Sequence, residues 1–227
     1  MPSLPPRPRL RLHWRRLLLG VTLAAAAALS GCKTIHSVKI DAINNPAKSL
    51  GTSYRLEMND PSGSQPEEVA QDARVLVKSA LAARGMYEAP PNGAAEMVIT
   101  AEYGVGPGQM KIVYKPSDSS LGGIATLGRG SPKPILVFEK YIKLTAREAA
   151  AAPPEPRAGG RRASAPRGEE LWSLTVSVED EKKDLGPYLA VLASTSVDYI
   201  GANSGSELHV AVDASTAEGN LRRRSGQ

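Results

Sequence analysis

The hydrophobic and polar positions of the chain alternate with a period of two over much of its length. This alternation is typical of strands that have one covered face. It predicts strands at residues 52–58, 96–103, 110–114, 135–146, 171–178 and 208–212. The glycine-rich run at 104–108 lies between the predicted strands at 96–103 and 110–114. We expect it to reverse the chain so that these two strands form a hairpin. The strands at 135–146 and 171–178 are expected to form a second pair.

Two segments follow the helical period instead. In the first, apolar residues recur at spacings of four, three and four, at Val69, Ala73, Leu76 and Ala80. Ser64 and Glu67 predict a capping box at the start of this helix, and Gly85 predicts its end. A second helix is expected after Asp184, which can cap it, because Pro187 would then lie in the first turn, where proline is tolerated.

The order strand, helix, four strands, helix, strand predicts an α+β domain. We expect a mainly antiparallel sheet with two helices packed on one face, over residues 51–214. Residues 149–168 are rich in Ala, Pro, Gly and Arg. Such a composition cannot bury enough apolar surface to offset the entropy of ordering, so we predict a disordered insertion there and a disordered tail at 215–227.

The amino terminus has the pattern of an export signal. Residues 1–16 are basic and rich in proline, residues 17–29 are apolar and uncharged, and two small residues precede Cys32. The uncharged segment 17–31 is shorter than the roughly 20 residues that cross a bilayer. We therefore predict a signal peptide over 1–31, followed by a tether over 32–50 with room for a short strand at 38–43.

Cys32 is the only cysteine, so an intramolecular disulfide is impossible. The run Leu29-Ser30-Gly31-Cys32 resembles the lipobox of bacterial lipoproteins. This resemblance implies that the Cys32 sulfur receives a diacylglycerol, that the signal is cut just before it, and that the acyl chains anchor a lipidated tether in a membrane. Lys33, in place of an Asp, points by the same resemblance to the outer membrane, on its periplasmic face. The alternatives are an ordinary signal peptide or a mitochondrial presequence with an incidental cysteine.

The charge of the chain is concentrated in this signal. The full sequence of 227 residues has 28 Lys and Arg against 23 Asp and Glu, a net charge of +5. The segment 1–31 contains no acidic residue and five arginines, so the mature chain would keep 28 − 5 = 23 basic side chains against 23 acidic ones. The basic balance therefore gives no support for a nucleic-acid partner.

Residues that could build a catalytic or metal site are sparse. His36 lies in the predicted tether, and His209 lies in the last strand on the face shared with Glu207, Ala211 and Asp213. A general base oriented by a carboxylate is one interpretation of His209. Because no serine lies in a nucleophile-elbow context, we favour a solvated strand histidine. With one cysteine, predicted to be acylated, a zinc site is not expected, and we predict no catalytic residue, metal or cofactor.

A long loop is predicted at 116–134. It is rich in Gly and Ser and exposes three spaced aliphatic side chains, Leu121, Ile124 and Leu127. Loops of this length inside a compact domain are usually functional or disordered. We interpret these residues as a candidate interaction loop that contacts a partner protein or the membrane surface.

Together with the lipobox, three segments resemble small bacterial envelope lipoproteins: the helix end at 82–85, the strand at 95–101 and the strand that contains Trp172. The resemblance brings no catalytic residue with it. It implies an outer-membrane lipoprotein that is not an enzyme and that acts as an interaction or assembly factor with an envelope protein as its partner. A lipopolysaccharide-assembly lipoprotein and an envelope hydrolase using His209 are the alternatives.

Overall fold

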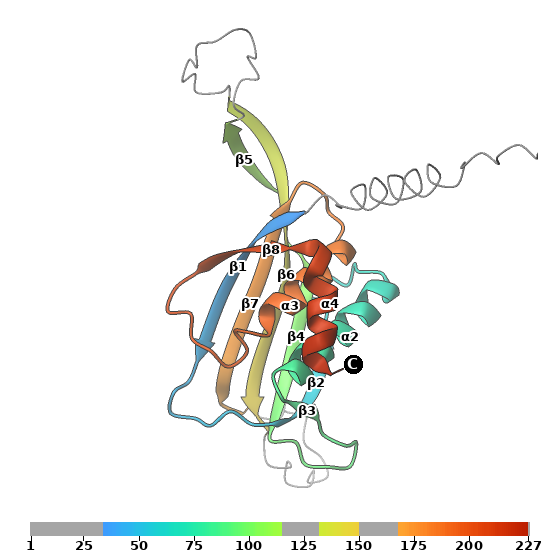
Figure 1. The fold of residues 1–227 in the computed structure, drawn as a ribbon, viewed down its shortest axis with the longest axis vertical. Coiled ribbons are helices and arrows are strands. Elements are labelled where there is room, and N and C mark those ends of the chain that lie inside the picture. The colour runs from blue at the N-terminus through green and yellow to red at the C-terminus, as the bar shows by residue number, and fades with distance from the viewer. Residues whose placement is uncertain (1–33, 115–131, 150–167, 227) are drawn as a thin grey trace, which may run out of the picture. The chain divides into compact units, whose positions relative to one another are not determined.

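The structure is a computed structural model that describes residues 34–114, 132–149 and 168–226 (Figure 1). The described residues form an α+β domain with an eight-stranded, mostly antiparallel sheet and three α-helices. The predicted α+β class is confirmed, with two corrections. The sheet is mixed, because β2 pairs in parallel with both β3 and β4, and there is one more helix than predicted.

The strands follow the order β3-β2-β4-β6-β7-β1-β8 across the sheet, and β5 pairs with β6. Their bounds are β1 Ile35–Asn44, β2 Ser53–Asn59, β3 Tyr87–Glu88, β4 Met97–Val105, β5 Gln109–Tyr114, β6 Pro132–Glu148, β7 Glu170–Asp180 and β8 Leu208–Asp213. The helices are α2 Glu67–Ala83, α3 Leu189–Ser196, which follows the 3-10 turn η1 Gly186–Tyr188, and α4 Ala214–Ser225.

The core lies between the helices and one face of the sheet (Figure 1). On β6, Ile142, Leu144 and Ala146 point into this core and are at most 1% exposed. Apolar positions of the neighbouring strands lie opposite them in register. The side chains between these positions, such as Lys143 and Thr145, point to the other face, which we call the helix-free face. Alternation therefore separates an apolar core from a charged and hydroxyl-bearing surface.

β1 lies inside the sheet, which corrects the predicted tether at 32–50. It pairs with β7 on one side and with β8 on the other, so that Val38 lies opposite both Val178 and Val210. Val38, Ile40 and Ala42 are at most 1% exposed. These three side chains alternate over a short stretch, and their burial makes β1 part of the folded domain.

β4 and β5 follow one another along the same side of β6, so the predicted hairpin between them is wrong. Val105 of β4 lies opposite Lys140, and Gln109 of β5 lies opposite Val137. The chain thus advances four residues, from 105 to 109, while β6 advances three, from 140 to 137. The glycine-rich run inserts one extra residue, as a β-bulge does, and the strand direction continues.

α2 lies close to its predicted position, but its predicted capping box is wrong. The N-cap is Pro66, which makes no side-chain cap hydrogen bond, so Ser64 and Glu67 do not form the expected pair. Gly85 follows the last turn with a φ of +85°, a conformation that favours glycine, as predicted. No helix among the described residues has the length and apolarity needed to span a bilayer.

α4 occupies most of the segment predicted to be a disordered tail, 215–227. The Asp213 side chain caps the helix by accepting a hydrogen bond from the backbone N–H of Ser215 at 3.0 Å. Ala217 and Leu221, four residues apart, are each 1% exposed and belong to the core. Two buried apolar side chains on one face explain why this otherwise polar segment forms a helix against the domain.

Candidate functional site

Part of β6 extends past the body of the sheet and forms a two-stranded ribbon with β5, which we call the arm. Residues 138–147 of β6 pair with β7, and residues 140–148 pair with β4. In the described structure, residues 132–137 pair only with β5. Figure 1 shows β5 and this part of β6 projecting beyond the rest of the sheet. The arm is thus defined as β5 together with residues 132–137.

One face of the arm is apolar along its whole described length. Three cross-strand pairs form this face: Met110 with Leu136, Ile112 with Pro134, and Tyr114 with Pro132. The three β5 side chains are between 63% and 69% exposed, and Leu136 is 45% exposed. In the alternation of β6 these positions continue the side that faces the helices in the body. The core-facing pattern therefore runs on into a region where its side chains remain exposed.

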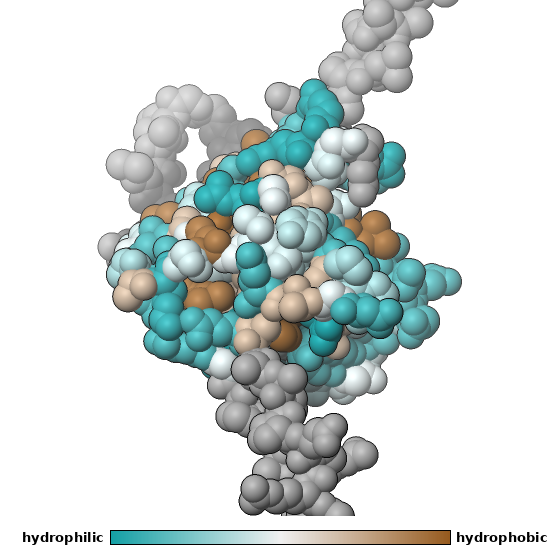
Figure 2. Space-filling view, turned by 90° about the horizontal axis from the view of Figure 1, so that it is seen from below, coloured by the Kyte–Doolittle hydropathy of each residue, from teal (hydrophilic) through white to brown (hydrophobic). Residues whose placement is uncertain are grey.

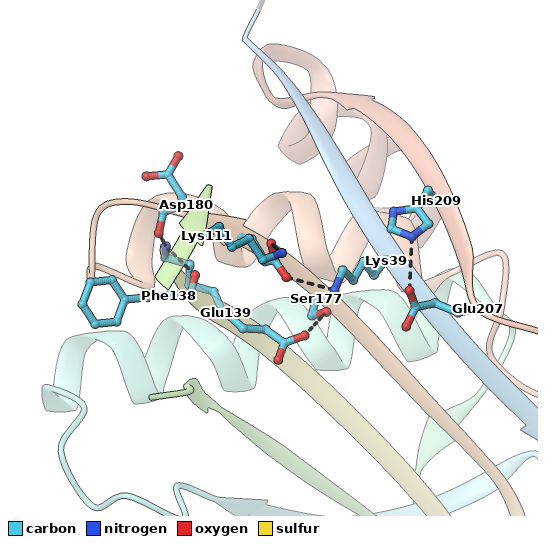
Figure 3. Close-up of polar contacts among 10 residues, drawn as sticks. Lys39, Lys111, Phe138, Glu139, Ser177, Asp180, Glu207 and His209 are labelled. Carbon is cyan, nitrogen blue, oxygen red and sulfur yellow. Dashed lines mark hydrogen bonds and ion pairs between the residues drawn. The ribbon is translucent and has the colours of Figure 1, made fainter. Parts of the chain in front are cut away.

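A cluster of ion pairs ties the arm to the body on the helix-free face (Figure 3). Glu179, near the end of β7, accepts hydrogen bonds from Lys111 of the arm and, at 2.9 Å, from Lys39 of β1. The hydrogen bond from Lys111, followed by that from Lys39, holds the pKa of the Glu179 carboxyl below its ordinary value, against the opposing effect of burial. One carboxylate thus links three strands.

A second polar contact lies beside this cluster. The hydroxyl of Ser177, which is 3% exposed, donates to the Glu139 carboxylate at 2.7 Å (Figure 3). Ser177 lies opposite Lys39 in register, and Lys39 lies opposite His209 on its other side. Serine, lysine and histidine therefore form a row across β7, β1 and β8. Each of them nevertheless bonds to a different carboxylate.

Lys140 is a buried lysine at the boundary between body and arm. Its side chain is fully buried, and its Nζ donates to the carbonyl oxygens of Phe138 at 3.1 Å and Asp180 at 2.9 Å. The Nζ also lies 5.0 Å from the ring centroid of Tyr188, which makes a T-shaped contact with His36. Burial lowers the pKa of the Lys140 amine. A less basic amine is a potential nucleophile, but burial and two carbonyl acceptors give this one a structural role at the strand ends.

The ring of Tyr188 completes this boundary cluster. Burial, together with a hydrogen bond with Asp180, raises the pKa of the Tyr188 hydroxyl to about 12. His36, predicted to lie in a tether, instead packs edge-on against this ring with the centroids 5.1 Å apart. The start of β1 is therefore fixed to the turn before α3 by an aromatic contact.

His209 is placed on the surface beside a carboxylate. Its side chain is 54% exposed, and its Nε2 lies 3.1 Å from Glu207 Oε1 (Figure 3). A carboxylate thus lies next to this histidine, although it comes from Glu207 before β8 and not from Asp213. Ser177 donates its hydroxyl to Glu139, so this serine is not hydrogen-bonded to His209. Residues 34–114, 132–149 and 168–226 contain no cluster of three or more His, Cys, Asp or Glu side chains arranged to hold a metal.

The helical layer carries an open groove of about 610 Å³ between α2, η1, α3 and α4. Its lining is mixed, with Leu76 and Leu189 at apolar positions and Asp72, Glu218 and Arg222 at charged ones. Arg222 and Glu218 pair with each other at 2.6 Å. Two of the charged groups that line the groove are therefore already paired with each other.

Four of the residues singled out by sequence lie outside the described residues: Cys32 and the candidate loop residues Leu121, Ile124 and Leu127. The described structure places the strands of the arm on both sides of that loop, and β6 already begins at Pro132, inside the segment predicted to be loop. The alternation of β5 is as predicted, but the strand pairs with β6 and not with β4. Recognition of 132–134 as strand would have revealed the arm.

No known protein family and no curated protein matches the sequence. Solved structures with a similar arrangement include a PelC dodecamer from Paraburkholderia phytofirmans, at 12% identity and a TM-score of 0.39, covering 74% of this chain and 99% of that one. Another is a PDZ domain protein from Parabacteroides distasonis, at 11% identity and a TM-score of 0.43, covering 85% of this chain and 43% of that one. At these identities and TM-scores we draw no conclusion from either likeness.

Proposed function

We propose that the protein is a bacterial envelope lipoprotein, anchored in the outer membrane through Cys32, that acts as a non-enzymatic interaction or assembly factor. The observation that carries this proposal is the position of β1. An interior strand begins at Ile35, three residues after Cys32. Because an extended chain advances at most about 3.6 Å per residue, three residues can span no more than about 11 Å. An acyl anchor would hold the folded domain directly at the bilayer.

The helix-free face and the arm support an interaction role. The helix-free face carries charged and hydroxyl side chains that are already bonded to one another, as in the clusters around Glu179 and Glu139. The arm adds exposed apolar side chains beside them. Such a combination suits contacts with other molecules better than turnover of a substrate, since the polar groups engage one another and not a shared reacting position.

The anchor is tested with Cys32→Ser in the full chain expressed in a Gram-negative host. We expect loss of labelled palmitate and release of the protein from the membrane fraction. A matched control adds Ser37→Cys to this variant, which returns a thiol five residues later, on an exposed position of β1. The thiol at 37 should not restore labelling, because it does not follow the apolar run. A Cys32→Ser protein that keeps its label and its membrane association would contradict the proposal.

The choice of membrane is tested at Lys33. The lipobox resemblance implies that an Asp immediately after the cysteine retains a lipoprotein at the inner membrane. Lys33→Asp should therefore move the protein from the outer-membrane to the inner-membrane fraction on a density gradient, while Lys33→Arg should leave it in place. An unchanged distribution of Lys33→Asp would remove the support for an outer-membrane location.

The contact between His209 and Glu207 favours one second candidate, an envelope hydrolase. His209→Ala separates the two functions, with Glu207→Gln as a partner variant. An interaction factor should stay folded and fully active in a cellular assay when the exposed imidazole is removed. Loss of activity in both variants, with unchanged circular dichroism and unfolding midpoint, would support the hydrolase instead.

A further inference from the structure

We propose that the apolar face of the arm inserts into the lipid surface beside the acyl anchor and gives the protein a second membrane contact. This inference rests on the proposed anchor at Cys32. In this proposal the exposed apolar face contacts the interfacial layer of the bilayer. The contact involves the side chains of Met110, Ile112 and Tyr114 with their partners on β6.

The start of β1 and the arm lie at the same end of the sheet. Val38 of β1 lies opposite Val178, which in turn lies opposite Lys140 of β6. Because both pairings are antiparallel, β1 runs back toward Ile35 in the direction in which β6 runs back toward the arm. Figure 1 shows β1 beginning at the end from which β5 projects. A lipid attached three residues before Ile35 would therefore hold the arm's end of the sheet toward the membrane.

Exposed apolar side chains gather at this end. Ten large hydrophobic side chains are exposed in the described structure, and five of them belong to the arm: Met110, Ile112, Val113, Tyr114 and Leu136. A sixth is Ile35 itself, which is 65% exposed. Figure 2 views the molecule from the opposite end, where hydrophobic residues are scattered among hydrophilic ones. A concentration of exposed apolar side chains at one end marks an interaction surface.

The chemistry of the arm suits the interfacial layer of a bilayer. Tyr114 has an apolar ring with a polar tip, which is the side-chain type enriched at membrane interfaces. The opposite face of the ribbon carries Lys133, whose ammonium group can lie near lipid phosphates. Lys111 on that face pairs instead with Glu179, which fixes the ribbon relative to the body.

The depth of insertion is limited by the backbone. A two-stranded ribbon has two edges with unpaired N–H and C=O groups, which cannot be left unsatisfied in hydrocarbon. The arm therefore lies within the hydrated interface, with its apolar side chains directed toward the acyl chains. The anchor raises the effective concentration of this weak second site, so that a shallow contact is sufficient to orient the domain.

The proposal is tested with tryptophan reporters in the acylated protein. The sequence has two tryptophans, of which Trp14 lies in the predicted signal and Trp172 is 1% exposed in the core. We compare Ile112→Trp with the matched control Ile43→Trp, since the two positions are 66% and 57% exposed but lie at opposite ends of the sheet. Each protein is reconstituted in vesicles of phosphatidylethanolamine and phosphatidylglycerol, with and without bromine on the acyl chains.

We expect the emission of Ile112→Trp to shift to shorter wavelength on vesicles and to lose intensity with brominated lipid. Ile43→Trp should show neither change. Vesicle-bound protein in which both reporters remain unquenched overturns the arm contact and leaves the anchor intact. A blue shift of Ile112→Trp without quenching assigns the arm face to a second copy of the chain and also overturns the proposal. A chain that carries no acyl group and does not bind vesicles contradicts the anchor, and with it the orientation on which insertion depends.

Discussion

β6 passes through two surroundings, and the same alternation of side chains has a different outcome in each. In the body, Leu144 and Ile142 face the helices and are each 1% exposed. In the arm, Leu136 occupies an equivalent alternate position and is 45% exposed. The body positions are covered by this chain's own helices, whereas the arm positions extend past them.

This difference shows that the alternation of side chains along a strand does not determine whether its apolar face is buried. Alternation follows from the pleat of the backbone, so it is the same in both regions. The free energy gained from burial depends on what lies against the apolar face, and in the arm no helix of the described structure does so. An apolar face that is maintained beyond its own core is a feature of surfaces that contact something else.

The largest expected effect comes from comparing Leu144→Ala with Leu136→Ala. Removing the buried side chain should cost about 2–5 kcal/mol of unfolding free energy, because it leaves a cavity among packed strands. Removing the exposed one should change the unfolding free energy by no more than about 0.5 kcal/mol in solution. Urea denaturation of both variants in the Cys32→Ser background measures this. Equal losses would mean that the arm is covered in the free protein, which contradicts the distinction.

An intermediate effect is expected from Lys140, at the boundary of the two regions. Burial lowers its pKa below the ordinary value of 10.5. Between the lowered value and 10.5, the unfolded chain binds more protons than the folded one, so the stability of the folded state rises with pH. Relative to Lys140→Met, the unsubstituted protein should gain up to about 1.4 kcal/mol per pH unit within this window.

Denaturation curves from neutral pH toward pH 10.5 provide the measurement for Lys140. Lys143→Met is the matched control, because Lys143 lies on the helix-free face of the same strand and its side chain is 47% exposed. Because Lys143→Met keeps Lys140, it should still gain stability with pH relative to Lys140→Met. Parallel curves for the protein and Lys140→Met would show that Lys140 keeps an ordinary pKa.

The smallest effect is expected at Glu179, which joins the arm to the body. Its pKa is lowered, so the contribution of its ion pairs is present above the ordinary carboxyl pKa and is lost as pH falls through the lowered value. Glu179→Gln should lower the unfolding free energy by no more than about 1 kcal/mol, because its partners Lys39 and Lys111 are partly exposed. Amide exchange in residues 109–114 should nevertheless become faster, whereas Glu139→Gln should leave it unchanged. Equal exchange in both variants would show that Glu179 does not restrain the arm.

The parts of the fold that could be predicted are those in which regularly spaced apolar residues are also buried by neighbouring elements. The buried stripe of α2 and the alternation of β6 within the body both follow from regular spacing of apolar residues. β1 was underestimated because its three buried side chains follow a predicted signal, in a segment interpreted as a tether. α4 was missed because only Ala217 and Leu221 are apolar in an otherwise polar tail, although Asp213 and Gly226 carry the expected cap signals.

Pairing was harder to predict than element type. A glycine-rich run between two alternating segments favours a turn, and sequence alone does not reveal that a third strand is long enough to pair with both segments. β6 has 17 residues and spans the bulge between β4 and β5. For the same reason the candidate site was placed in the loop at 121–127, while the described apolar surface lies on the strands that flank it.

The pairing of β1 also sets the order in which this domain can fold. Val38 reaches its partner in β7 only after 178 − 38 = 140 residues, and its partner in β8 lies later still. Contacts of such long sequence separation slow folding, because the chain must close a large loop before any pairing energy is gained. The first strand to emerge is therefore left without neighbours until the carboxy-terminal third has followed. For the envelope lipoprotein that we propose, this arrangement would keep the chain from folding until its carboxy-terminal third is available.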